Sequence, residues 1–182
     1  MRIVAGEFRG RRLAGPDGRA ARPTSDKVRE ALFSILGEVE DARVLDLFAG
    51  TGALALEALS RGAAGATLIE RDRRMFAVAQ RNIDEVLADQ SDRAKLIRGD
   101  ALKLLGSLPG ASFDLVLIDP PYADAETIAP KLASALPALL APRARVVVES
   151  DRRAPLELAG RALTQAFERN YGDTLIRIFD AL

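Results

Sequence analysis

Short apolar runs alternate with amphipathic stretches from residue 43 onward, and this alternation is the main pattern of the chain. The apolar runs predict strands at Arg43–Phe48, Ala66–Glu70, Ala94–Arg98, Phe113–Asp119 and Ala144–Glu149. Helical spacing predicts helices at 53–61, 72–88, 101–106, 124–140 and 152–159. The unbroken run Leu115–Ile118 is typical of a strand buried on both faces, as in a parallel sheet covered by helices. We therefore expect an α/β fold with a doubly wound, mostly parallel sheet.

The two ends of the chain depart from this alternation. Leu163–Arg169 and Thr174–Phe179 flank a turn at 171–173 and predict an antiparallel hairpin that closes one edge of the sheet. Apolar positions from Val28 to Leu36 predict a helix that is capped at Thr24 or Ser25 and stops at Gly37. Glycines among short apolar pieces in residues 1–22 predict a hairpin or extended arm, ahead of a single globular domain at 23–182.

Composition excludes several kinds of chemistry. The 182 residues contain no cysteine, which rules out disulfides and thiolate metal sites, and no histidine, which rules out Ser-His-Asp hydrolysis and most zinc chemistry. No apolar run approaches the roughly 18 residues of a membrane span, and the first residues lack the apolar region of a secretory signal. We expect a cytoplasmic monomer with no metal and no membrane association.

The net charge of zero hides a basic N-terminus. Residues 1–22 carry six arginines and two acids, a net charge of +4. Arginine has a planar fork that suits phosphate, so the arm predicts a polyanionic partner. A solvated surface segment explains the charge equally well. The six arginines are Arg2, Arg9, Arg11, Arg12, Arg19 and Arg22.

A glycine loop follows the first predicted strand. Gly50 and Gly52 lie between the strand that contains Asp46 and the next helix, where backbone can approach a ligand closely. Taken alone, the two glycines fit a tight turn equally well. Glu70 ends the next strand 24 residues after Asp46, near the spacing of an acid that binds ribose hydroxyls. Asp100 after the third strand occupies the matching position for an adenine amino group. A carboxylate at Asp46 would repel pyrophosphate and attract an ammonium, which favours S-adenosylmethionine over a dinucleotide.

The tetrapeptide Asp119-Pro120-Pro121-Tyr122 follows the fourth predicted strand. Its prolines lock φ and hold the Asp119 carboxylate and Pro120 carbonyl in a fixed geometry. Both oxygens can accept hydrogen bonds from an exocyclic amine and turn its lone pair toward a methyl donor. Tyr122 offers a ring on which a flipped base can stack. Asp-Pro is also a common turn opener, so a strand-ending turn is the alternative.

Together these features resemble the bacterial family of 16S ribosomal RNA guanine-N2 methyltransferases, which use S-adenosylmethionine on a Rossmann-like fold. The resemblance covers nearly the whole chain, through motifs that include 2–6, 9–11, 22–24, 28–33, 46–52, 56–62, 119–122 and 171–174. It implies a substrate that is the assembled or partly assembled small subunit.

The resemblance also assigns residues to three roles. It implies catalysis by Asp119, Pro120 and Tyr122. It implies cofactor contacts from Asp46, Phe48, Ala49, Gly50, Thr51, Gly52, Glu70, Arg71, Asp100 and Ala101. It implies RNA phosphate contacts from Arg2, Arg9, Arg11, Arg12 and Arg22.

Three other functions compete with this one. A DNA adenine-N6 or cytosine-N4 methyltransferase uses the same tetrapeptide, but such enzymes usually carry a separate target-recognition region for which the chain has no room. A nicotinamide oxidoreductase needs a third glycine near the helix start, where residues 53–56 are Ala-Leu-Ala-Leu. A non-catalytic RNA-binding protein has no need of the Asp119–Tyr122 tetrapeptide.

Overall fold

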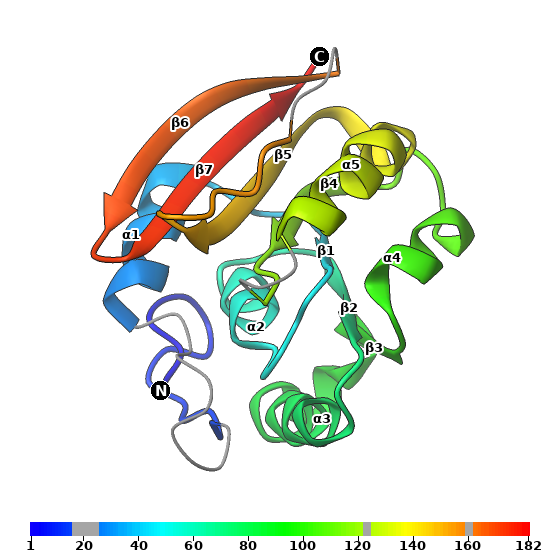
Figure 1. The fold of residues 1–182 in the computed structure, drawn as a ribbon. Coiled ribbons are helices and arrows are strands. Elements are labelled where there is room, and N and C mark those ends of the chain that lie inside the picture. The colour runs from blue at the N-terminus through cyan, green and yellow to red at the C-terminus, as the bar shows by residue number, and fades with distance from the viewer. Residues whose placement is uncertain (16–25, 122–124, 159–161) are drawn as a thin grey trace.

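The computed structural model describes residues 1–15, 26–121, 125–158 and 162–182. In these ranges seven strands form one sheet of order β3-β2-β1-β4-β5-β7-β6 (Figure 1). The strands are β1 (Arg43–Asp46), β2 (Gly65–Glu70), β3 (Ala94–Arg98), β4 (Phe113–Ile118), β5 (Leu140–Asp151), β6 (Leu163–Tyr171) and β7 (Thr174–Ala181). β1 to β5 are parallel, while β7 runs antiparallel to both β5 and β6. The predicted fold class and its C-terminal hairpin are confirmed.

Strand order reverses between β1 and β4, which makes this pair the switch point of the sheet. β2 and β3 extend the sheet on one side of β1, and β4 begins the other side. Asp46 pairs with Leu117 in the register of the two strands. Ligands of open α/β sheets bind at the carboxyl ends of strands at such a point.

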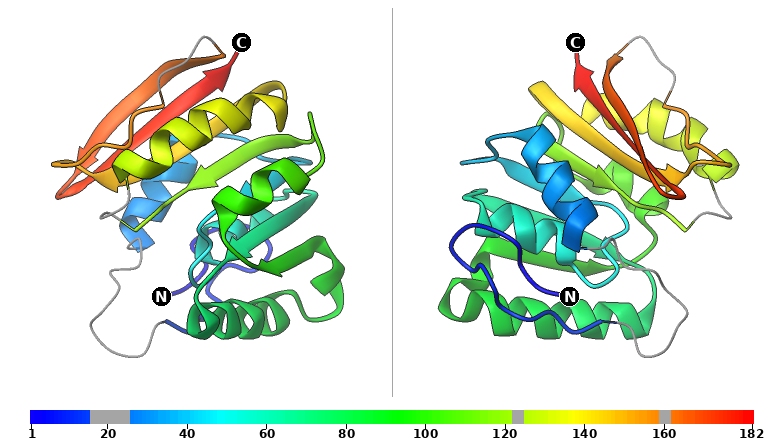
Figure 2. Two further views of the ribbon diagram at one scale, coloured as in Figure 1. Left: turned by 45° about the vertical axis from the view of Figure 1, so that its right-hand side comes forward. Right: turned by 90° about the vertical axis from the view of Figure 1, so that its left-hand side faces the viewer.

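Helices cover both faces of the sheet, which explains the unbroken apolar runs of the central strands (Figure 2). α1 (Asp26–Leu36), α2 (Ala53–Ser60) and α3 (Arg73–Leu87) contribute to one buried cluster, together with Leu115 and Leu117. α4 (Ala101–Leu104) and α5 (Ala125–Ala135) contribute to the other, together with Val116 and Ile118.

The short 3-10 helices are η1 (Ala88–Arg93), η2 (Leu105–Ser107) and η4 (Leu136–Ala138). None of the helices in the described ranges has the length and apolar character needed to span a bilayer.

The predicted helix at 152–159 is wrong. The Asp151 side chain accepts the amide of Arg153 at 2.7 Å, and Ala154 forms an isolated bridge with Asp151. This turn and the ring of Pro155 leave residues 152–158 without helical hydrogen bonds, while Leu156 and Leu158 still bury their side chains. The predicted helix at 124–140 is too long, because α5 ends at Ala135 and β5 already begins at Leu140.

Residues 1–15, the N-terminal segment, fold back on themselves and pack on the body of the protein. Arg2 and Arg12 form an antiparallel bridge, and Leu13 donates its amide to the Met1 carbonyl at 3.0 Å. The apolar members Ile3, Phe8 and Leu13 join the core cluster that α1, α2 and α3 share. The rest of the predicted arm, with Arg19 and Arg22, and the predicted cap at Thr24 or Ser25 lie outside the described residues.

Candidate cofactor and base site

The glycine loop lies between β1 and α2, beside the end of β2. Ala49 donates its amide to the Ile69 carbonyl at 3.0 Å, and Gly52 donates to the Ala49 carbonyl at 2.7 Å. Gly52 caps α2 with a φ of 77°, and a Cβ there would lie 3.3 Å from the Leu68 side chain. Gly50 has a φ of 54° with open space where a Cβ would be, so its backbone conformation alone favours glycine. Thr51 is buried between the two.

Asp46 at the end of β1 is a buried carboxylate without a partner in the described part of the chain. It is 1% exposed, and neither of its oxygens has a hydrogen-bond partner among the described residues. Burial raises the pKa of Asp46 to about 7; the amides of Ala55 and Phe48, which approach without full hydrogen bonds, lower it, and the charge of Glu70 raises it. A buried unpaired carboxylate is costly, so this position fits a cationic ligand such as an ammonium group.

Glu70 at the end of β2 holds the glycine loop. Its Oε2 accepts the amide of Gly50 at 2.7 Å, and its Oε1 accepts the amide of Asp72 at 2.6 Å. The side chain is 9% exposed. Each carboxylate oxygen has a further lone pair, so Glu70 can still accept hydroxyl groups of a ribose.

The other predicted cofactor residues surround this edge of the sheet. Asp100 follows β3 and caps α4, because its Oδ1 accepts the amide of Leu102 at 3.0 Å. Ala101 is the buried first residue of α4, and Phe48 is half-buried against the cluster of α4 and α5. Arg71 is exposed directly after Glu70. These residues and the glycine loop therefore follow the carboxyl ends of three neighbouring strands, β1, β2 and β3.

Asp119 and Pro120 follow β4, the strand next to β1 on the other side of the switch point. Asp119 is half-buried and Pro120 is buried, while Pro121 is exposed. Leu47 donates its amide to the Leu117 carbonyl at 3.1 Å, which fastens the start of the glycine loop to β4 just before Asp119. Tyr122 lies outside the described residues.

Glu149 is an acid at this edge that the sequence pattern did not single out. It is 5% exposed, near the end of β5. Ile118 pairs with Val148, so the same register, continued by one residue, places Asp119 beside Glu149. The sequence nevertheless contains a feature that could have identified Glu149, because this residue ends a predicted apolar strand as Glu70 does.

The described arginines of the N-terminal segment differ in their partners. Arg11 donates to the Val86 carbonyl and lies over the Phe8 ring, with 4.9 Å between its guanidinium carbon and the ring centroid. Arg2 pairs with Asp26 at 3.6 Å. Arg9 and Arg12 are exposed and form no side-chain ion pair within the described part of the chain.

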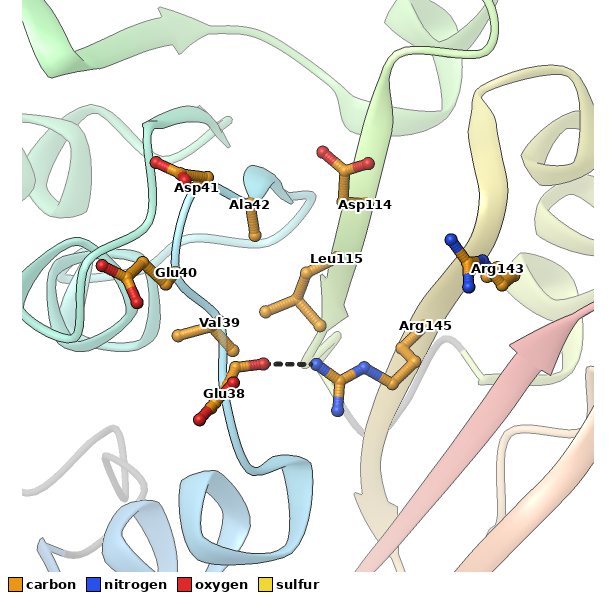
Figure 3. Close-up of a pocket in the computed structure, with 9 residues that line it drawn as sticks. All are labelled: Glu38, Val39, Glu40, Asp41, Ala42, Asp114, Leu115, Arg143 and Arg145. Atoms are coloured by element: carbon orange, nitrogen blue, oxygen red, sulfur yellow. Dashed lines mark hydrogen bonds between the residues drawn. The ribbon is translucent and has the colours of Figure 1, made fainter.

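A separate hollow of about 320 Å³ lies at the opposite, amino edge of the sheet (Figure 3). Two of its lining residues bind neighbouring groups: Asp114 forms a bidentate pair with Arg43, and Arg145 donates to the backbone carbonyl of Glu38 at 2.9 Å. The strands start at this edge, so the hollow is remote from Asp46 and Asp119. Its lining consists of Glu38, Val39, Glu40, Asp41, Ala42, Asp114, Leu115, Arg143 and Arg145.

Comparison with known proteins identifies the family. The family described as Conserved hypothetical protein 95 matches residues 1–180. The chain belongs to this family. Ribosomal RNA small subunit methyltransferase D of Escherichia coli (strain K12) is 47% identical over 123 residues, which cover 67% of this chain and 60% of that protein. The protein of the same name from Haemophilus influenzae is 34% identical and covers 86% of this chain and 81% of its own length.

Solved structures of similar proteins confirm the fold. An Escherichia coli protein described as a candidate methyltransferase superposes with a TM-score of 0.84 at 37% identity, covering 100% of this chain and 97% of its own. An RNA methyltransferase from Salinibacter ruber, solved with S-adenosyl-L-homocysteine, has a TM-score of 0.65 at 18% identity and covers 88% and 94% of the two chains. The second likeness shows a shared Rossmann-like fold. The chain spans 60% of the length of the Escherichia coli strain K12 relative above.

Proposed function

We propose that this protein transfers a methyl group from S-adenosylmethionine to the exocyclic N2 of a guanine in 16S ribosomal RNA. One observation carries the proposal: the buried carboxylate of Asp46, unpartnered among the described residues, lies at the end of β1, next to the strand that leads into Asp119-Pro120. In this proposal, the site for the cationic donor and the site for the amine meet at the switch point of the sheet. The names of the small-subunit methyltransferase relatives support the substrate class.

The residues of the glycine edge fit the cofactor group by group. Asp46 would bind the ammonium group of the cofactor. The second lone pairs of the Glu70 oxygens would accept hydrogen bonds from the ribose hydroxyls, and Asp100 would accept one from the adenine amino group. Arg71, which is exposed directly after Glu70, would add a further cofactor contact. When bound, the cofactor supplies a methyl group that is already activated by a sulfonium. Positioning and electrostatics from the protein then contribute most of the remaining acceleration.

Asp119 and Pro120 would orient the amine. The lone pair of a guanine N2 is delocalised into the ring, which makes the nitrogen a poor nucleophile. Hydrogen bonds from its two N–H groups to the Asp119 carboxylate and the Pro120 carbonyl direct the lone pair toward the donor. The Asp119 carboxylate also stabilises the positive charge that develops on the nitrogen and accepts its proton. Tyr122 would stack on the base.

The N-terminal segment would hold the RNA. Arg9 and Arg12 present exposed guanidinium groups to phosphate, and Arg2 and Arg11 keep the segment in place. We propose that a single copy of the protein acts on the assembled or partly assembled small subunit, with Arg22 adding a further phosphate contact.

The test is methyl transfer to small subunits that lack their native modifications. The protein is incubated with these subunits and radiolabelled S-adenosylmethionine, and digestion to nucleosides follows. We expect label in N2-methylguanosine, and labelling about 100- to 1000-fold slower with the Asp119→Ala variant. Label in adenine or cytosine of duplex DNA, with none in the subunits, would contradict the proposal. Cofactor binding without any transfer would instead indicate a non-catalytic RNA-binding protein.

A further inference from the structure

Asn82 on α3 joins the N-terminal segment to the glycine loop. Its side chain is fully buried, with 0% exposure. Its Oδ1 accepts the amide of Ala14 at 2.7 Å, and its Nδ2 donates to the carbonyls of Ala14 at 3.1 Å and Thr51 at 2.9 Å. Two chain segments that are far apart in the sequence therefore share one buried amide.

The bond to Thr51 restrains the part of the loop that has the most freedom. Thr51 stands between Gly50 and Gly52, which both have positive φ and an intrinsically flexible backbone. Because the Thr51 carbonyl belongs to the peptide that carries the Gly52 amide, Asn82 also orients that amide, which donates to Ala49 at 2.7 Å. The loop conformation at the proposed cofactor site thus depends on the position of the Asn82 side chain.

The bonds to Ala14 connect the same side chain to the basic segment. Arg11 donates to the Val86 carbonyl one helical turn further along α3, so the segment follows this helix from Arg11 to Ala14. Arg12 is exposed between these two anchors. Any polyanion that binds the segment and holds it against α3 also holds Ala14 against Asn82.

We propose that Asn82 couples the two binding sites, so that RNA on the N-terminal segment tightens cofactor binding at the glycine loop. The identity of the two ligands rests on the proposed function, whereas the link between the sites is built from the hydrogen bonds above. Coupling of this kind is reciprocal, so the cofactor must tighten RNA binding by the same factor. The expected factor is about 5- to 20-fold, within the usual range for coupled sites.

The test compares variants at Asn82 with a control at the other end of the segment. Asn82→Ala removes all three bonds, whereas Asn82→Asp keeps the size and the acceptor for the Ala14 amide but loses both donations. Ser60→Ala is the matched control, because Ser60 Oγ accepts the amide of Phe8 at 2.9 Å and donates to the Ala5 carbonyl at 2.6 Å. Ser60 therefore also holds the segment, but from the last residue of α2.

Calorimetry measures the Kd of S-adenosylhomocysteine with and without saturating unmodified small subunits. We expect small subunits to lower this Kd in the wild type and in Ser60→Ala. In both Asn82 variants the Kd should be nearly the same with and without subunits. A second measurement uses the protein without RNA: S-adenosylhomocysteine should slow hydrogen exchange at the Ala14 amide in the wild type but not in Asn82→Asp.

Two results would overturn the coupling. In the first, small subunits would tighten S-adenosylhomocysteine binding as strongly in the Asn82 variants as in the wild type. In the second, Ser60→Ala would lose this tightening to the same extent as the Asn82 variants. A wild-type protein that binds no S-adenosylhomocysteine would overturn the proposed function as well. Binding without dependence on Asn82 would overturn only the coupling.

Discussion

Two buried carboxylates, 11 residues apart in the chain, have opposite environments. Glu57 on α2 is 0% exposed and accepts the amides of Val4 and Ala5 at 2.8 and 3.0 Å. It also pairs with Arg61 at 2.8 Å and with Arg29 at 3.5 Å. Asp46 is 1% exposed and has no hydrogen-bond partner among the described residues.

The difference separates a charge that the fold satisfies from one that we propose a ligand satisfies. Amides and guanidinium groups compensate the burial of Glu57, and those bonds fasten the N-terminal segment and α1 to α2. Nothing in the described protein compensates the burial of Asp46 in the same way. Folding retains an unfavourable carboxylate there, which is the pattern expected where a ligand completes the site.

Removal of the structural carboxylate should have the largest effect. Glu57→Ala leaves the fully buried Arg29 without this charge and two backbone amides without acceptors. We expect a loss of about 3–5 kcal/mol in the free energy of unfolding, measured by urea denaturation. Glu85→Ala is the control, because its pair with Arg81 is exposed, and it should scarcely change the midpoint. Equal effects of the two variants would show that the Glu57 bonds are not structural.

Removal of the proposed amine acceptor should act on turnover rather than on folding. Asp119→Ala is expected to lower kcat by about 100- to 1000-fold, the usual cost of one transition-state interaction. Cofactor affinity should stay nearly unchanged, because Asp119 lies on the other side of the switch point from the glycine loop. Asp119→Asn keeps one acceptor oxygen, so its rate of methyl transfer in single-turnover assays should lie between those of the wild type and Asp119→Ala. An equal collapse of cofactor binding would reassign Asp119 to the cofactor.

Neutralisation of Asp46, the proposed ligand of the cofactor's ammonium, should stabilise the ligand-free protein and weaken cofactor binding. We expect Asp46→Asn to raise the free energy of unfolding by about 1–3 kcal/mol at pH 8, in contrast to the Glu57 variant. It should weaken S-adenosylhomocysteine binding about 100-fold through loss of the ammonium partner. Denaturation and calorimetry on the same preparation measure both effects. A destabilised Asp46→Asn protein would show that Asp46 has a structural partner.

The pH dependence sharpens the same contrast. The pKa of Asp46 is about 7 in the folded protein, above its ordinary value of 3.8, so the folded state binds this proton more tightly than the unfolded state. The contribution of Asp46 to stability is therefore complete below pH 3.8 and falls as the pH rises to about 7. An ammonium ligand requires the ionised form, so wild-type affinity should rise as the pH increases through about 7. Calorimetric titrations across this range measure the rise, and Asp46→Asn should not show it.

The smallest expected effect is on RNA binding. Replacement of both Arg9 and Arg12 by Gln should reduce the slope of log affinity against log salt by about one unit for each phosphate that is no longer neutralised. Arg143→Gln is a matched control, because this exposed arginine lines the hollow at the opposite edge of the sheet. An unchanged slope in the double variant would make the basic segment an ordinary solvated surface.

Local pattern predicted most of the fold and part of the candidate site. The central strands were predictable because burial on both faces demands consecutive apolar residues, as in Leu115–Ile118. Positive φ at Gly50 and Gly52 follows from the turn that leads into α2. The prediction of a helix at 152–159 failed because the Asp151 side chain begins a turn ahead of Pro155. The Arg152 amide also donates to the Asp173 carbonyl of the distant hairpin at 2.8 Å, a contact that the local pattern does not contain.

The sequence by itself determined most of the elements and the chemical groups at their ends, since hydrophobic period, proline and glycine act over a few residues. Only the tertiary structure decided which charges are satisfied. Glu57 and Asn82 are ordinary polar residues of helices when read along the chain, and Asp46 is marked there only by its position before the glycine loop. The partners that define the roles of Glu57 and Asn82 lie far away in the sequence, at Val4 and Ala14. Whether burial of a polar group is favourable is set by such distant partners, and no local pattern contains them.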